Sequence, residues 1–231
     1  MKNDLKAGLV NRQKRQDQIL NTALKVFADK GYPATTISKL VAEAKVSRGT
    51  FYLYYQSKKD VFDALLKRFF VPLMNTLAGM KFRSESEKEE EDIRVFCHEL
   101  TKVLFQNKVL AKIIWTDAFR LHPTHQIFIN EQAQQMQNLL NHCFKFHTQS
   151  FSPAPCDTNL LACCFLGTTK EVLTNYPGEL SFWDLEEKIT SFVHFVFEGL
   201  VRFKPLVLPQ STLIPQEHAY SEELNHKNEY H

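Results

Sequence analysis

Apolar side chains recur at helical spacing along most of the chain. Residues 12–30 carry them on one face, and Gly31 follows as a stop signal. Thr36 is suited to cap a second, short helix that ends near Lys45, and Ser47 is suited to cap a third. Two short helices joined by about three residues have the spacing of a helix-turn-helix motif.

The rest of the chain predicts further helices. A fourth helix is expected from Lys58 to about Gly79, followed by a solvated, charge-dense loop over residues 83–92. Later helical patterns lie at about 92–106, 109–121, 124–148, 157–175 and 182–203.

The predicted fold class is therefore all-α, with nine helices expected. We expect a three-helix domain at 12–72, a larger helical domain at 73–204, and a flexible tail at 205–231.

The composition excludes several classes of fold and cellular location. Of 231 residues only seven are glycine and nine are proline, too few for a turn-rich β protein or a glycine-looped nucleotide fold. We find no apolar run of about 18 residues and no stretch of signal-peptide character, so a cytoplasmic location is expected. Five cysteines without CxxC spacing favour free thiols over a disulfide framework or a structural zinc site.

Charge is unevenly distributed along the chain. Residues 1–70 hold 14 Lys and Arg against six Asp and Glu, a net charge of +8, whereas residues 71–231 have a net charge of −6. A basic segment joined to a mildly acidic remainder indicates that one end meets a polyanion. An ordinary basic pair of helices is the alternative that charge alone leaves open.

The third helix has two different faces. Phe51 and Tyr55 can point inward, while Arg48, Gly49 and Tyr52 share the outward side. An arginine can donate two hydrogen bonds to a guanine edge, and a glycine lets the backbone approach DNA closely. The same face is also compatible with a solvated three-helix bundle that binds nothing.

Residues 12–70, and above all Ala34–Ile37, Val46–Tyr52 and Tyr54–Val61, resemble the DNA-binding domain of TetR-family transcriptional regulators. The resemblance implies contacts to DNA, with phosphates or bases in the groove, by Thr36, Ser47, Arg48, Gly49, Thr50, Tyr52, Tyr54 and Lys58. Of these, Thr36, Tyr54 and Lys58 are the implied phosphate contacts. The chain departs from the family in having Lys45 where a glycine is usual, at a turn position expected to be left-handed, with about 1 kcal/mol of strain.

The same resemblance implies a dimeric bacterial regulator, most often a repressor, that binds a palindromic operator and responds to a small apolar or aromatic effector. It makes residues 12–72 the DNA-binding domain and residues 73–204 the effector-binding and dimerisation domain. No cofactor, metal or membrane partner is expected. We find no GxSxG, HExxH, Walker A or GxGxxG stretch, so catalysis is not expected. A helical small-molecule enzyme and a protein-binding adaptor are the competing functions, and DNA retention by residues 1–70 would exclude both.

A candidate effector pocket lies in the second domain. It is an aromatic and thioether-containing set with few charges among it, namely Phe96, Leu100, Trp115, Phe119, Met136, Leu140 and Phe144. Most of such a set is expected to be core. His98, Asp117, His122 and Gln132 are the polar candidates for orienting a ligand, and His122 with His125 is too small a set for a metal site.

The last two helical patterns are unusually apolar and need a partner surface. By the resemblance, they would pair with their twofold copies as a four-helix interface. The candidate interface residues are Leu161, Phe165, Val172, Phe192, Val196 and Leu200. The alternative is that these helices only close the domain.

Overall fold

The structure is a computed structural model that describes residues 2–79, 86–116, 121–151 and 157–202. The helices are α1 (Lys2–Lys30), α2 (Ile37–Glu43), α3 (Arg48–Tyr52), α4 (Lys58–Ala78), α5 (Ser86–Gln106), α6 (Lys108–Thr116), α7 (Pro123–Phe151), α8 (Thr158–Asn175) and α9 (Phe182–Arg202). Over these ranges there are nine helices and no strand, which confirms the all-α prediction. No helix in these ranges is both long and apolar enough to cross a lipid bilayer.

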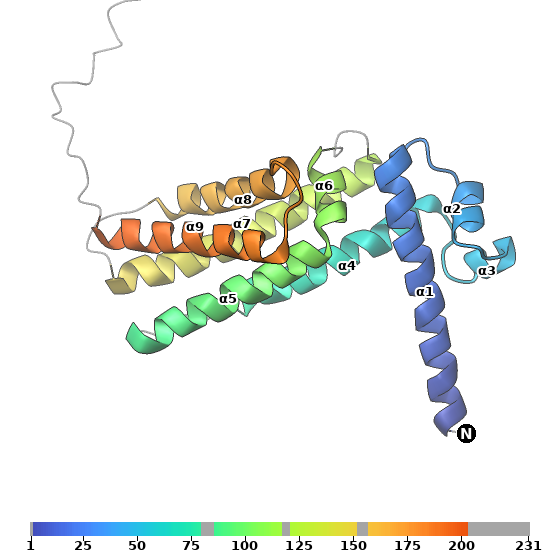
Figure 1. Cartoon of the computed structure of the whole chain (residues 1–231), viewed down its shortest axis with the longest axis horizontal. Helices are drawn as coiled ribbons and strands as arrows, with labels where there is room; N and C mark the ends of the chain where they lie inside the picture. The colour runs from blue at the N-terminus through green and yellow to red at the C-terminus, as the bar shows by residue number, and fades with distance from the viewer. Residues whose placement is uncertain (1, 80–85, 117–120, 152–156, 203–231) are drawn as a thin grey trace, which may run out of the picture.

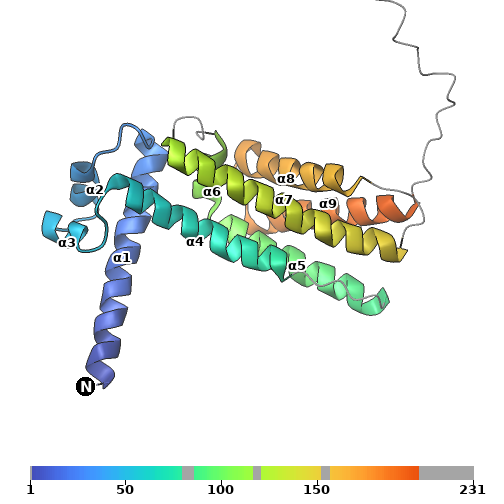
Figure 2. The same ribbon diagram turned by 180° about the vertical axis from the view of Figure 1, so that it is seen from behind.

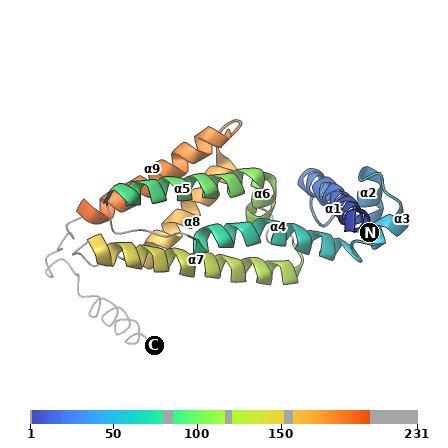
Figure 3. The same ribbon diagram turned by 90° about the horizontal axis from the view of Figure 1, so that it is seen from below.

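The helices are arranged in two groups that α4 connects. Helices α1, α2 and α3 form one end of the molecule, and α4 begins beside them and runs into a bundle with α5 to α9 (Figure 1). Within the bundle α5 packs along α9, and α7 packs along α8. The view from behind shows α4 and α7 side by side (Figure 2), and the view from below shows α5 and α9 on the opposite side of the bundle (Figure 3).

Local capping chemistry defines the first turns of the short helices. The hydroxyls of Thr36, Ser47 and Ser57 each accept a hydrogen bond from the amide three residues later, at 3.2, 3.0 and 3.1 Å. Each cap satisfies one of the amide donors that a helix start leaves unpaired. The predicted starts of α2, α3 and α4 are thereby confirmed.

The turn between α2 and α3 depends on a left-handed residue. Lys45 has φ +52°, as expected from the position where glycine is usual. Its amide donates to the Ala42 carbonyl at 3.1 Å, and the Val46 amide donates to the Val41 carbonyl at 3.2 Å. This pair of bonds is the Schellman arrangement, which ends a helix and redirects the chain.

Two helix starts differ from the sequence predictions. Helix α1 begins at Lys2 instead of near Arg12, and α5 begins at Ser86, so the expected loop over 83–92 is wrong for residues 86–92. Glutamate and lysine are good helix formers, which explains why a charge-dense run continues as helix. The expected tail at 205–231 lies outside the described residues, and the proposed domain boundaries remain predictions.

Replacing Lys45 tests the strain in this turn. We expect Lys45→Gly to increase the free energy of unfolding by about 1 kcal/mol, because glycine adopts positive φ without a Cβ clash. Lys45→Ala removes the same exposed side chain but keeps the clash, so it should change stability by less than half as much. Urea unfolding of both variants checks this, and equal effects of glycine and alanine would contradict it.

Candidate DNA interface

Helix α3 presents two chemically different sides, as its sequence predicts. Phe51 is fully buried and Tyr55 is 4% exposed, so these rings anchor the helix to the domain core. Arg48, Gly49 and Tyr52 are exposed on the other side. A helix fixed by its apolar side can hold its polar side at a constant angle to a flat or grooved partner.

The outward side chains of α3 are positioned by contacts with α2 and with the helix start. The Arg48 Nη2 donates to Ser38 Oγ on α2 at 2.9 Å, and both side chains are exposed. A bond of this kind gives way to a base edge at little cost, because both partners are already solvated. Ser47 Oγ lies 2.8 Å from Thr50 Oγ1, so these hydroxyls support each other at the helix start.

Gly49 is not required by the protein's own packing. A Cβ at this position would meet only Ser47 Oγ at 3.8 Å, an ordinary contact distance. Its φ is also not in the left-handed region. The space that this glycine leaves is therefore on the outside of the helix, where a partner can approach the backbone.

Lys58 has a structural role that the sequence did not reveal. Its ammonium donates to the carbonyls of Tyr32 at 2.7 Å and Pro33 at 3.1 Å, and it lies 4.5 Å from the centre of the Tyr32 ring. Partial burial lowers the pKa of this lysine. The expected phosphate contact of Lys58 thus competes with a bond that joins the start of α4 to the loop after α1. Thr36 is exposed and caps α2, and Tyr54 is half-buried.

The start of α7 packs directly against the DNA-binding end through His125. Its imidazole is buried, with ring centres 5.3 Å from Tyr32 and 4.7 Å from Phe62. Its Nε2 lies 3.0 Å from Asp63 Oδ1, and the same carboxylate accepts from Lys59 Nζ at 2.7 Å. The sequence singled out this histidine only as a weak metal candidate, because its neighbours come from elements far apart in the chain.

Burial sets the charge of His125. Loss of solvation lowers its pKa, the nearby Lys59 and His122 lower it further, and the Asp63 carboxylate opposes them. The ring is therefore neutral in the folded chain at pH 7. No group of three or more potential metal ligands occurs among the described residues.

The residues of the candidate effector pocket lie in the bundle core. Phe96 and Leu100 on α5 and Met136, Leu140 and Phe144 on α7 are buried together. Trp115 on α6 is half-buried, with its ring 6.3 Å from Phe69 on α4, and Phe119 lies outside the described residues. This set adjoins α4 directly. Of the polar candidates, His98 is exposed and contacts Glu186 at 2.8 Å, His122 is exposed, Gln132 is half-buried, and Asp117 is outside the described residues.

A hollow occurs elsewhere in the bundle, between α8 and α9. Its lining residues are Phe165, Thr168, Thr169, Val172, Lys188, Ile189 and Phe192. The predicted pocket residues do not line this hollow. The assignment of the effector pocket therefore remains a prediction.

The candidate dimer residues lie mostly against their own chain, and their assignment to an interface remains a prediction. Phe165 and Val196 are buried, and the Phe165 ring lies 6.5 Å from Phe144 and 5.9 Å from Phe192. Leu161, Val172 and Phe192 are half-buried against the core, and the Leu200 side chain is outside the described set.

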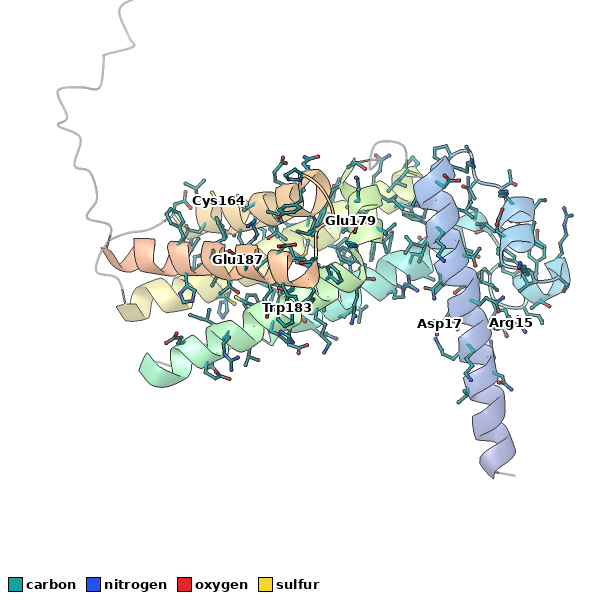
Figure 4. All side chains as sticks on the ribbon, in the orientation of Figure 1. Arg15, Asp17, Cys164, Glu179, Trp183 and Glu187 are labelled. Carbon is teal, nitrogen blue, oxygen red and sulfur yellow. The ribbon has the colours of Figure 1, made fainter. Side chains whose placement is uncertain are left out.

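Other apolar residues of α8 and α9 face outward. Leu160 is 59% exposed on α8, and Phe195 is 73% and Trp183 is 72% exposed on α9. Cys163, Cys164 and Gly167 are exposed on α8 as well, and Figure 4 shows the labelled Cys164 and Trp183 on these two helices. Prediction from the sequence missed Phe195 because the interface candidates were taken from the apolar stripe of α9, whereas Phe195 lies on the polar side, between Ser191 and Glu198.

Comparison with known proteins gives matches of two kinds. Residues 19–65 match the family profile described as "Bacterial regulatory proteins, tetR family". YuxN of Bacillus subtilis, an uncharacterized HTH-type transcriptional regulator, is 30% identical over 76 residues, which are 33% of this chain and 26% of YuxN. The chain thus matches about a quarter of the length of that curated relative.

Solved structures extend the likeness over most of the chain. The fatty acid degradation regulator FadR from Bacillus halodurans is 26% identical with a TM-score of 0.57, and the match covers 81% of this chain and 95% of FadR. A putative TetR-family regulator from Syntrophomonas wolfei is 20% identical with a TM-score of 0.61 and covers 83% of this chain and 99% of that one. At 20% identity the second match shows the fold alone.

The pH dependence of stability tests the buried state of His125. Because its pKa in the folded chain lies below the ordinary value near 6.5, the unfolded chain binds a proton that the folded chain does not. The stability from this residue is complete above that ordinary value and is lost as the pH falls from it through the lowered pKa of the folded chain. The loss is at most about 1.4 kcal/mol per pH unit for one proton.

We expect His125→Phe, which keeps a ring between Tyr32 and Phe62, to reduce the loss of stability between pH 7.5 and 5.5. His142→Phe is the matched control, because His142 is exposed on the same helix, lies roughly five helical turns from His125 and should leave the loss unchanged. Urea unfolding across this pH range makes the measurement. A His125→Phe profile parallel to the wild-type profile would mean that His125 is not the titrating group.

Proposed function

Since the chain belongs to the TetR family of bacterial regulatory proteins, we propose that it is a sequence-specific DNA-binding repressor. One observation carries the proposal: α3 is anchored by buried Phe51 and Tyr55 and turns Arg48, Gly49 and Tyr52 to the outside of a basic domain. This family consists of transcriptional regulators, so the chain is not an enzyme. Because bacterial DNA lies in the cytoplasm, the proposed activity requires a cytoplasmic protein.

The proposed roles at the operator divide into base reading and positioning. Arg48 reads a base, and Gly49, Thr50 and Tyr52 line the rest of the surface that enters the groove. Thr36, Tyr54 and Lys58 contact phosphates, and Ser47 holds the start of α3. To contact a phosphate, the Lys58 ammonium must give up at least one of its hydrogen bonds to the Tyr32 and Pro33 carbonyls, or donate to the phosphate in addition to them.

The proposed repressor acts as a homodimer on a palindromic operator. Two copies of α3 related by a twofold axis would meet half-sites about one DNA turn apart, roughly 34–36 Å. The exposed apolar residues of α8 and α9, Leu160 and Phe195 among them, support an interface on these helices. Water contact with such large side chains is unfavourable, and a second copy would bury them.

A small apolar or aromatic effector would control this repressor from the bundle core. The candidate pocket set adjoins α4 through the Trp115–Phe69 contact, and α4 reaches the DNA-binding end. An effector that binds better to a geometry unable to bind the operator would release DNA, because only differential affinity shifts a population. Acyl-chain compounds are the first class to test, since FadR of Bacillus halodurans is described as a fatty acid degradation regulator.

Two substitutions separate base reading from positioning. Arg48→Ala should weaken binding to the preferred duplex by about 1–3 kcal/mol and relax preference at one symmetric position. Lys58→Ala should weaken all sequences alike and reduce the slope of log affinity against log salt by about one for each phosphate that is no longer neutralised. Titrations with labelled duplexes measure both, and Lys112→Ala, at an exposed position of α6, is the control.

If Arg48→Ala weakens all sequences uniformly, Arg48 positions the protein and the base-reading role is wrong. If neither substitution changes DNA binding while the fold survives, the proposed function fails.

The dimer is tested by placing a charge on the outward face of α9. Phe195→Glu should give monomers, because a carboxylate would be buried in an apolar interface without a partner. Ile127→Glu is the control, because Ile127 is exposed on α7 and should leave the dimer intact. Light scattering gives the mass of both variants. A folded Phe195→Glu protein that remains dimeric would put the interface on another surface.

A further inference from the structure

The first half of α1 extends beyond the body of the molecule. Figure 1 shows this part of the helix projecting past α2 and α3, at the end of the molecule that carries the candidate DNA interface. Residues 10–15 are all exposed, and the next buried residue along α1 is Ile19. An isolated helix of this length is only marginally stable in water, so a partner would help to order it.

One stripe of α1 changes character where the body of the molecule ends. Arg12 and Arg15 lie seven and four positions before Ile19, so the three residues share one face of the helix. Ile19 is 1% exposed and packs in the core, whereas Arg12 and Arg15 are exposed. This face of α1 is therefore apolar where it packs in the core of the DNA-binding end. In the exposed part of the helix before it, the same face is basic.

Hydrogen bonds place Arg15 close to the turn that orients α3. Its Nη1 donates to Gln18 Oε1 at 2.8 Å, and Gln18 Nε2 donates to the carbonyl of Ala44 at 2.8 Å. Ala44 ends α2 and directly precedes Lys45. In Figure 4 the labels of Arg15 and Asp17 fall on opposite sides of α1, with Arg15 on the side of α2 and α3.

We propose that this basic stripe, defined by Arg12 and Arg15, binds DNA phosphates outside the base pairs that α3 reads. The inference rests on the proposed function and adds a second contact between the protein and DNA, outside the one that α3 makes. Residues 1–16 carry five Lys and Arg against one Asp, which is complementary to a polyanion. Residues 2–15 span roughly 20 Å as a helix, enough to pass about six phosphates of one strand.

DNA suits this stripe better than an anionic membrane surface does. Helices that lie on membranes present a large apolar face opposite a basic one. Residues 11–15 are Asn, Arg, Gln, Lys and Arg, all exposed, so this part of α1 offers charge and hydrogen bonding without an apolar face.

The test compares two double variants that lose the same charge from the same helix. The stripe variant combines Arg12→Gln with Arg15→Gln, and the control combines Lys14→Gln with Lys25→Gln. Lys14 and Lys25 are exposed, lie three turns apart and occupy the opposite face of α1. Circular dichroism and thermal unfolding first establish that both variants keep the wild-type fold.

Binding is measured over a salt series with two duplexes, both built on the sequence selected by the wild-type protein from a random library. One duplex ends at the half-sites, and the other continues for ten base pairs on either side. For the longer duplex, we expect the slope of log affinity against log salt to fall by about two per protomer in the stripe variant. The control should change it by less than half as much, and the short duplex should bind both variants similarly.

Equal slopes for the stripe variant and the control would overturn the inference, as would a decrease in affinity that is the same on both duplexes. Binding of the wild type, but not the stripe variant, to phosphatidylglycerol vesicles with unchanged DNA affinity would overturn it in favour of a membrane. Failure of the proposed function looks different, because the wild-type protein would then select no duplex at all.

Discussion

The apolar face of α4 is buried along its whole length, and both ends of the molecule depend on it. In its first half the Phe62 ring lies 5.6 Å from Phe27 on α1, 4.9 Å from Tyr32 and 4.7 Å from His125. In its second half Phe69 and Phe70 meet the rings of Trp115 on α6 and Phe128 on α7. Fully burying each such side chain contributes about 1.5–3 kcal/mol, so α4 cannot shift without repacking both regions.

This arrangement provides a physical route from the bundle to α3. A ligand that separates helices around Trp115 would move α4, and the start of α4 holds the loop after α1 through Lys58 and the start of α7 through Asp63 and His125. Because these contacts combine packing with partly buried polar bonds, they favour a small number of discrete arrangements over continuous deformation. Two such arrangements are what a ligand-controlled repressor needs.

Features that depend on neighbouring residues could be predicted from the sequence. The caps at Thr36, Ser47 and Ser57 and the inward Phe51 and Tyr55 follow from chemistry within one or two helical turns. The positive φ of Lys45 could be expected because the resemblance marks that position as a glycine site. These elements include most of what defines the helix-turn-helix.

Features that depend on distant parts of the chain could not be predicted. The Lys58 ammonium is bound by carbonyls 25 and 26 residues earlier, and His125 meets residues of α4 and of the loop after α1. On α9 the buried Ile189, Val193 and Val196 form one stripe and the exposed Phe195 lies outside it, but a helical period does not say what covers an exposed side chain. The early start of α1 was missed because the polar residues 11–15 interrupt the apolar pattern of the helix.

The central claim is that two copies of α3 read DNA symmetrically, and selection of duplexes from a random library tests it most directly. The purified full-length protein is incubated with random duplexes, and the retained molecules are sequenced after several rounds. The account predicts enrichment of an inverted repeat whose half-site centres lie about one helical turn, roughly 34–36 Å, apart. Retention without any enriched sequence, or enrichment of a single site that lacks twofold symmetry, would contradict it.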